Sequence, residues 1–165
     1  MRQFLPALRR QGLLAGQCVT MKIAIGCDHA GYEIKEVLKV RLADAGYDVI
    51  DVGCDSTESV DYPKYGHAVG KAVASGEADR GIAICGTGIG IGIAANKVPG
   101  IRAGVVHSVE TAHMTKNHND ANVLCFGARV VDLDTALAMV DEWLNTEFAG
   151  GKHERRINEI EDLDF

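Results

Sequence analysis

Short apolar runs alternate with longer segments of helical periodicity along most of the chain. Five of these runs have the length of a strand and are rich in valine and isoleucine, which favours buried β-structure. They are Lys22–Cys27, Tyr47–Val52, Gly81–Cys85, Arg102–Val106 and Val123–Gly127. The pattern therefore predicts five strands separated by helices.

The intervening segments repeat their apolar residues at helical spacing. Between Tyr32 and Ala45, one stripe carries Ile34, Val37, Leu38 and Leu42. Asp61 is a candidate N-cap for a helix that has Pro63 in its first turn and runs toward Ser75. Further helices are expected from within Gly86–Gly92 to Lys97, over Ser108–Lys116, and over Leu133–Leu144.

This alternation predicts an α/β fold, a three-layer doubly wound sandwich with a parallel sheet of about five strands. Such folds bind ligands at the carboxyl ends of their strands. The polar groups expected there are Cys27-Asp28-His29, Cys85-Gly86-Thr87 and Val106-His107. The connector His118-Asn119-Asp120 is a further candidate, whose place depends on the fold.

Residues 1–20 differ from the rest and carry no motif. They contain no apolar run long enough for a signal peptide or a membrane span. We interpret them as a dispensable N-terminal extension, and residues 21–165 as a single domain.

Composition and charge limit the possible partners. Of 165 residues, 47% are hydrophobic and 24% charged, which is typical of a globular protein. The formal net charge of −6 gives no general attraction to nucleic acid or to anionic membranes, so neither is expected as a partner. An anionic ligand would need a local basic cluster. Lys152, His153, Arg155 and Arg156 form one, and a solvated helix face is the alternative.

The five cysteines are widely spaced and odd in number, which favours free thiols in a reducing, cytoplasmic compartment. No set of cysteines and histidines has the spacing of a zinc site, so no metal is expected.

Cys85 carries the strongest chemical signal. A thiol at a strand end, followed by glycines that open a helix, faces backbone N–H groups and the positive end of the helix dipole. These groups favour a thiolate and could also hold an oxyanion. A buried structural cysteine is the alternative. Gly90–Ala95 also matches the dinucleotide pattern G-x-G-x-x-A, but it follows the third strand and lacks the ribose-binding acid.

Two other polar groups have ordinary structural explanations as well. Asp28 could simply cap a helix, and a histidine such as His118 or His113 could lie at the surface or at a helix end.

Several segments together resemble the ribose-5-phosphate isomerase B and galactose-6-phosphate isomerase family. They follow the family's order across Lys22–Ile157, and CGTGIG and HNDANVL are the most specific. The segments are GCDHAG (26–31), DYP (61–63), ICGTGIGIGIAANKVPGIRA (84–103), HNDANVLCFGARV (118–130) and GGKHERRI (150–157).

The resemblance implies a sugar-phosphate isomerase without a cofactor, and a role for each matching residue. Cys85 would carry the proton between C1 and C2, and His118 would assist ring opening. The enediolate loop would comprise Gly86, Thr87, Gly88, Ile89 and Gly90, with Thr87 counted among the catalytic residues. Asp28, His29, Tyr62 and Asn119 would contact the sugar, and Arg129, Lys152 and Arg156 would receive the phosphate.

The resemblance also implies the strand order 2-1-3-5-4 and a homodimer or homotetramer with sites shared between subunits. One departure is Lys152, where the family often has arginine; lysine keeps the charge but lacks the bidentate fork. The expected reaction interconverts ribose 5-phosphate and ribulose 5-phosphate in the pentose phosphate pathway. Allose 6-phosphate or galactose 6-phosphate isomerisation is the alternative, and a non-catalytic nucleotide-binding module is a third interpretation.

Overall fold

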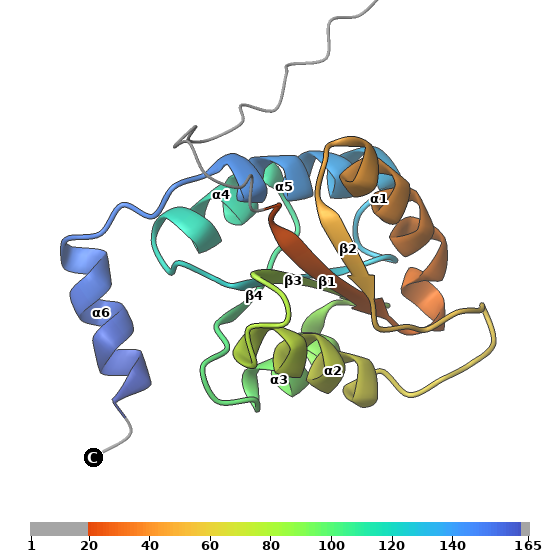
Figure 1. Cartoon of the computed structure of the whole chain (residues 1–165), viewed down its shortest axis with the longest axis horizontal. Coiled ribbons are helices and arrows are strands. Elements are labelled where there is room, and N and C mark those ends of the chain that lie inside the picture. The colour runs from red at the N-terminus through yellow and green to blue at the C-terminus, as the bar shows by residue number, and fades with distance from the viewer. Residues whose placement is uncertain (1–19, 163–165) are drawn as a thin grey trace, which may run out of the picture.

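Five parallel strands form one sheet in the order β2-β1-β3-β5-β4 in the computed structural model, which describes residues 20–162 (Figure 1). The strands are β1 (Lys22–Cys27), β2 (Asp48–Asp51), β3 (Arg80–Cys85), β4 (Ala103–Val105) and β5 (Val123–Gly127). Both the predicted fold class and the expected strand order are confirmed.

Helices cover both faces of this sheet (Figure 1). On one face lie α1 (Tyr32–Asp44), α4 (Val109–Asn117) and α5 (Leu133–Asn145); on the other lie α2 (Pro63–Ala74) and α3 (Ile89–Asn96). A short 3₁₀ turn, η1 (His29–Gly31), precedes α1, and α6 (Lys152–Glu161) stands away from the body of the domain.

The core has two parts, one on each face of the sheet. On one face, the fully buried side chains include Leu38 of α1, Phe126 of β5, and Met139 and Trp143 of α5. On the other face they include Val69 of α2 and Ile91 of α3. The central strands β1, β3 and β5 are apolar along almost their whole length because both of their faces are covered.

The expected stripe of α1 is wrong at one position. Val37 is 41% exposed, whereas Lys35 is fully buried on the same face as Leu38 and Leu42. The Lys35 ammonium donates hydrogen bonds of 2.8 and 2.7 Å to the two carboxylate oxygens of Asp51 on β2. A paired charge can therefore occupy a position where an apolar side chain was expected.

The expected cap of α2 is also wrong. Tyr62, not Asp61, is the N-cap, and no side chain caps this helix. Pro63 occupies the first turn, and since proline has no N–H, one of the donors that a cap would satisfy is missing.

Residues 1–19, the bulk of the expected N-terminal extension, lie outside the described residues. Within residues 20–162, none of the helices has the length and apolar character needed to cross a bilayer.

Candidate active site

Cys85 ends β3 and faces the glycine loop that leads into α3. The amide of Gly88 donates a hydrogen bond of 3.1 Å to the Cys85 Sγ. Gly88 adopts a left-handed φ of 80°, which L side chains rarely reach, and it is the N-cap of α3. The amide therefore presents its donor to the sulfur at the N-terminus of the helix.

The glycine loop packs against the end of β5 so closely that the glycines at this contact have no space for a side chain. A Cβ on Gly88 would lie 2.6 Å from the Phe126 carbonyl carbon, and one on Gly127 would lie 2.5 Å from that of Thr87. The carbonyl oxygen of Cys85 accepts a hydrogen bond of 2.8 Å from the amide of Ala128. The amide donors are therefore held in place before any ligand arrives.

Two further predicted residues flank this loop. A Cβ on Gly86 would lie 3.3 Å from the Arg129 Nη1, so the guanidinium of Arg129 lies over the residue that follows Cys85. A Cβ on Gly90 would lie 2.4 Å from the Tyr62 Cζ, which places the Tyr62 ring directly against the loop. The structure thus brings a thiol, a cation and a phenol to one edge of the sheet.

Asp28 and His29 follow β1 at the same edge, next to β3. The amide of Asp28 donates to the carbonyl of Ile84, the residue before Cys85, over 3.0 Å. Asp28 is 6% exposed, and its carboxylate caps η1 by accepting from the amide of Ala30 at 2.9 Å. The capping role considered for Asp28 is therefore present.

His29 is oriented by the loop between β2 and α2. Its Nδ1 accepts a hydrogen bond of 3.2 Å from the amide of Val60. Since Nδ1 is the acceptor, Nε2 carries the ring proton of the neutral imidazole and can donate to a ligand.

His118 and Asn119 lie at the opposite edge of the sheet from Cys85. They precede Asn122, whose carbonyl accepts from the amide of Gly81 at the start of β3. From Gly81 to Cys85 the strand rises roughly 13 Å. Within one chain, the structure therefore does not bring His118 to the thiol.

Arg102 holds the connector that carries His118. Its Nε donates to the carbonyl of Asn119 and its Nη2 to the carbonyl of Asp120, each over 3.1 Å. Lys116 also binds the Asp120 carboxylate.

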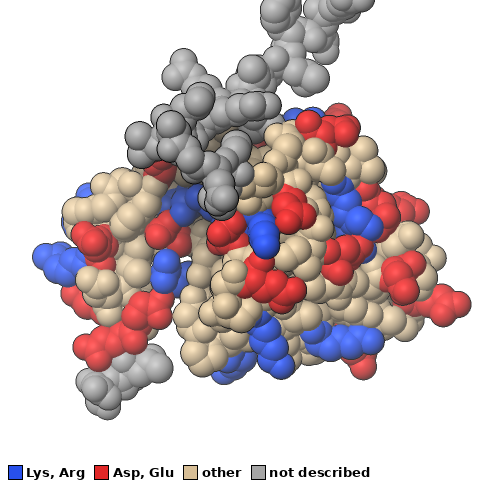
Figure 2. All heavy atoms as spheres, in the orientation of Figure 1, with Lys and Arg blue, Asp and Glu red and all other residues tan. Residues whose placement is uncertain are grey.

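The basic residues of α6 gather beside His118 rather than beside Cys85. The rings of His118 and His153 stack with centroids 4.1 Å apart and an interplanar angle of 7°. Lys152 and Arg156 are exposed on the same helix. In Figure 2, α6 carries basic and acidic side chains together, so its positive charge is local rather than part of a wide basic surface.

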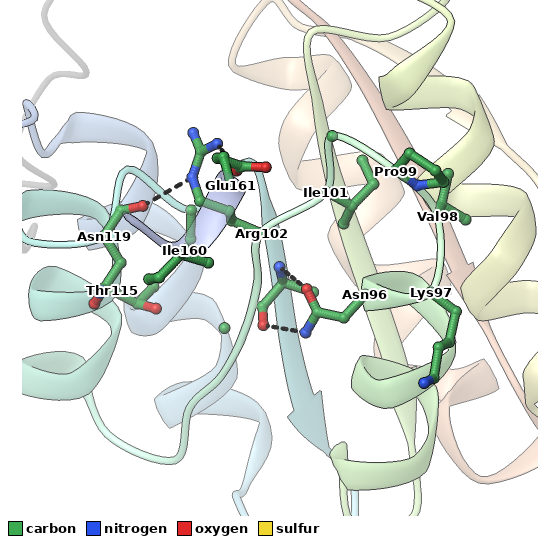
Figure 3. A pocket seen from close by; sticks show the side chains of 14 residues that line it. Asn96, Lys97, Val98, Pro99, Ile101, Arg102, Thr115, Asn119, Ile160 and Glu161 are labelled. Atoms are coloured by element: carbon green, nitrogen blue, oxygen red, sulfur yellow. Dashed lines mark hydrogen bonds and ion pairs between the residues drawn. The ribbon is translucent and has the colours of Figure 1, made fainter. Parts of the chain in front are cut away.

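A groove of about 750 Å³ separates α6 from the body of the domain. Asn96–Gly104 line one side, and Ile160 and Glu161 line the other (Figure 3). Arg102 bridges the two sides through a 2.7 Å ion pair with Glu161. Asn119 lines this groove whereas Cys85 does not, so the groove belongs to the His118 edge.

Two other cysteines, Cys27 and Cys125, are buried thiols with raised pKa values. Burial, reinforced by Cys54 with its Sγ 3.8 Å away, raises the pKa of Cys27 to about 12. Complete burial also raises the pKa of Cys125 well above its usual range. Both thiols therefore stay protonated near neutral pH, as expected of small apolar core residues.

The predicted site residues therefore form two groups. The Cys85 group comprises Asp28, His29, Tyr62, Cys85, Gly86, Thr87, Gly88, Ile89, Gly90 and Arg129. The His118 group comprises His118, Asn119, Lys152 and Arg156. Sequence reasoning gave His153 no partner and missed the Lys35–Asp51 pair.

A doubly wound α/β domain that presents a thiol to backbone amides at the carboxyl ends of its strands has the arrangement of an enzyme active site. The family model "Ribose/Galactose Isomerase" matches residues 23–160. The chain therefore belongs to the ribose/galactose isomerase family and is a sugar isomerase. The family match favours an isomerase over the nucleotide-binding module that the glycine pattern also allowed.

Individual relatives agree with this assignment. Ribose-5-phosphate isomerase B of Escherichia coli is 50% identical over 139 residues, covering 84% of this chain and 93% of that protein. The solved ribose-5-phosphate isomerase B of Clostridium thermocellum is 57% identical with a TM-score of 0.84, covering 86% of this chain and 95% of that one. D-erythrulose-4-phosphate isomerase 2 of Mycolicibacterium smegmatis is 47% identical over 133 residues, covering 79% of this chain and 88% of that protein.

Proposed function

We propose that the protein interconverts ribose 5-phosphate and ribulose 5-phosphate, with Cys85 as the base. The observation that carries this proposal is the Gly88 amide bonded to the Cys85 Sγ at the start of α3. In the open-chain aldose, the Cys85 thiolate removes the proton from C2 and returns it to C1. The loop amides stabilise the negative charge that develops on oxygen in the enediolate.

Other residues bind and prepare the substrate. The Nε2–H of His29 is a donor suited to a sugar oxygen, and the guanidinium of Arg129 over the glycine loop is a donor for the phosphate. Lys152 and Arg156 receive the phosphate, and His118 moves the proton that opens the furanose ring. Asn119 binds the sugar.

Two copies of the chain build each site in this proposal. Because His118 and α6 lie at the edge opposite Cys85, they can serve a thiol only when a second copy brings its own Cys85 edge to them. Two surfaces favour such a contact. Ile89 and Ile93 on α3 are each 57% exposed, and α6 buries only Ile157 within its own chain. We propose a second copy of the chain as the occupant of the groove beside α6, in a homodimer or a tetramer made of such dimers.

Mixing inactive variants tests the shared site. Cys85→Ala and His118→Asn each lower the turnover of ribose 5-phosphate in a homodimer, but a heterodimer keeps one site with both native residues. If half of the dimers are mixed and half of the sites in each are intact, co-refolded variants should regain about a quarter of the wild-type activity. No recovery in an assembly shown to contain both chains would contradict shared sites.

A substrate panel tests the reaction itself. Purified protein should turn over ribose 5-phosphate with a higher kcat/KM than allose 6-phosphate, galactose 6-phosphate or a tetrose 4-phosphate. A clear preference for a hexose phosphate would establish the alternative reaction. A tightly bound nucleotide with no isomerase turnover would contradict the whole proposal.

The proposal also includes a cytoplasmic location, because a thiol base has to stay reduced and the cytoplasm is a compartment that keeps thiols reduced. Labelling of Cys85 by a membrane-permeant thiol reagent in intact cells, and protection by substrate, would test this.

A further inference from the structure

The His118–His153 stack lies outside the Cys85 group and has no assigned role. Its rings are nearly parallel, at 7°, with centroids 4.1 Å apart, and they come from different elements: the end of α4 and the first turn of α6. Among residues 20–162, no hydrogen bond to the ring nitrogens of His118 accompanies this contact. The orientation of the His118 ring therefore depends on the stack.

The backbone around the stack is fixed on both sides. The amide of Ala149, before α6, donates to the carbonyl of Asn117 over 2.9 Å, and the Asn117 side chain donates to the carbonyl of Glu147 over 2.9 Å. These two bonds tie the segment before α6 to the end of α4. They bring His153 to His118 without the long body of α6 having to pack on the domain.

The surroundings of His153 favour the uncharged form of its ring. Partial burial, followed by the positive charges of His118, Lys152 and Arg156, lowers the pKa of His153. The lowered pKa favours the uncharged form of the His153 ring, which disfavours a cation against the face of His118.

We propose that His153 is a positioning residue for His118. It covers one face of the ring and fixes the plane in which His118 meets the sugar, and so supports ring opening rather than proton transfer at carbon. The inference rests on the proposed function, because it assigns His153 to the ring-opening step of that reaction. It also links ring opening to phosphate binding, because α6 carries His153 as well as Lys152 and Arg156.

The chemistry of the two sugars separates the steps. Ribose 5-phosphate is a furanose that has to open before C2 can lose its proton. Ribulose 5-phosphate cannot close a furanose ring because its O5 carries the phosphate, so it enters the site open. Incorporation of solvent deuterium at C1 of ribulose 5-phosphate therefore reports proton transfer without ring opening.

Three variants of α6 make the test. His153→Phe keeps a flat ring, whereas His153→Leu keeps an apolar side chain without one. Glu159→Gln is a control on the exposed side of the helix, where Glu159 is 73% exposed. A misplaced catalytic group costs one to two orders of magnitude in rate, so His153→Leu should lower kcat on ribose 5-phosphate by about tenfold or more. His153→Phe and Glu159→Gln should stay near the wild-type kcat.

Deuterium exchange into ribulose 5-phosphate should remain near the wild-type rate in all three variants. Equal losses of turnover and exchange in His153→Leu would show a structural role only and overturn the proposal. So would a His153→Phe variant as slow as His153→Leu, or a His153→Leu variant with wild-type turnover. Failure of the proposed function is a separate outcome, since wild-type protein would then not turn over ribose 5-phosphate.

Discussion

The amide of Gly88 lies 3.1 Å from the Sγ of Cys85 and donates a hydrogen bond to it. The sulfur ends a central strand and the amide opens a helix, so the contact joins the two elements at the point where ligands bind in this fold class. Burial raises the pKa of Cys27 and of Cys125, so these two thiols favour the protonated form.

Replacing Cys85 should remove the base while leaving binding largely intact. We expect Cys85→Ala to lower kcat by roughly 10²–10⁴-fold with a modest change in KM, measured by steady-state turnover of ribose 5-phosphate. Cys27→Ala and Cys125→Ala are matched controls that should keep nearly full turnover. A folded Cys85→Ala protein with near-wild-type kcat would rule out the assignment.

His118→Asn should affect ring opening selectively. Turnover of cyclic ribose 5-phosphate should fall, whereas turnover of D-erythrose 4-phosphate should be spared. The tetrose phosphate cannot close a furanose ring, because its O4 carries the phosphate. Equal losses on both substrates would mean that His118 serves another step or only the structure.

Arg156→Ala should mainly raise KM, because phosphate binding contributes equally to the ground and transition states. A charge-assisted contact is worth about 1.5–3 kcal/mol, which corresponds to a rise of roughly 10- to 150-fold. Lys152→Arg should be neutral or lower KM, since a bidentate fork replaces a point charge. The measurement is the KM ratio of free ribose to ribose 5-phosphate, and an unchanged ratio in Arg156→Ala would leave α6 as a charged surface.

A protein that begins at Met21 should fold and keep its turnover. The strand β1 starts at Lys22, and the expected site residues all follow it. Turnover and light scattering would check activity and assembly together. Loss of either would show that the N-terminal extension belongs to the site or to an interface.

The Lys35–Asp51 pair should stabilise the fold in a pH-dependent way. Burial alone would raise the pKa of Asp51, but hydrogen bonds from Lys35 and Lys39 outweigh it and hold this pKa below its usual range. A lowered pKa in the folded state contributes stability above the unfolded value of about 3.9, and this contribution is lost as pH falls through the folded value.

Asp51→Asn should therefore lower the free energy of unfolding at pH 7 by about 1–3 kcal/mol, because the buried Lys35 loses a partner that is itself partly exposed to solvent. The difference from wild type should narrow as pH falls below about 4, as followed by urea unfolding. The exposed Asp55→Asn is the control. A difference that stayed constant down to pH 3 would contradict this origin.

The apolar runs were sufficient to predict the sheet. The bounds of Lys22–Cys27 and Val123–Gly127 agree with the structure, because continuous burial on both faces leaves a strand no polar positions. The stripe of α1 was wrong because hydropathy cannot tell that Lys35 would find a carboxylate on the neighbouring strand. Its spacing of three and seven residues from Leu38 and Leu42 was the available signal.

The candidate site was predicted as a set of residues but not as an arrangement. A segment that leaves a helix and enters a parallel strand lies at the amino edge, so the position of His118 before Val123 indicates that it faces away from Cys85. The sequence contains no comparable indication of the stack between His118 and His153. The stack depends on the direction in which α6 leaves the domain, and local sequence does not determine that direction.

The separation of Cys85 and His118 on opposite edges has a consequence for dilution. If each site needs both edges, the specific activity should fall as the protein is diluted below the dissociation constant of its dimer. Substrate that touches both chains binds only the associated form, so by mass action it should shift that threshold to lower protein concentrations. The sugar would then act as a cross-bridge between subunits as well as the molecule being transformed.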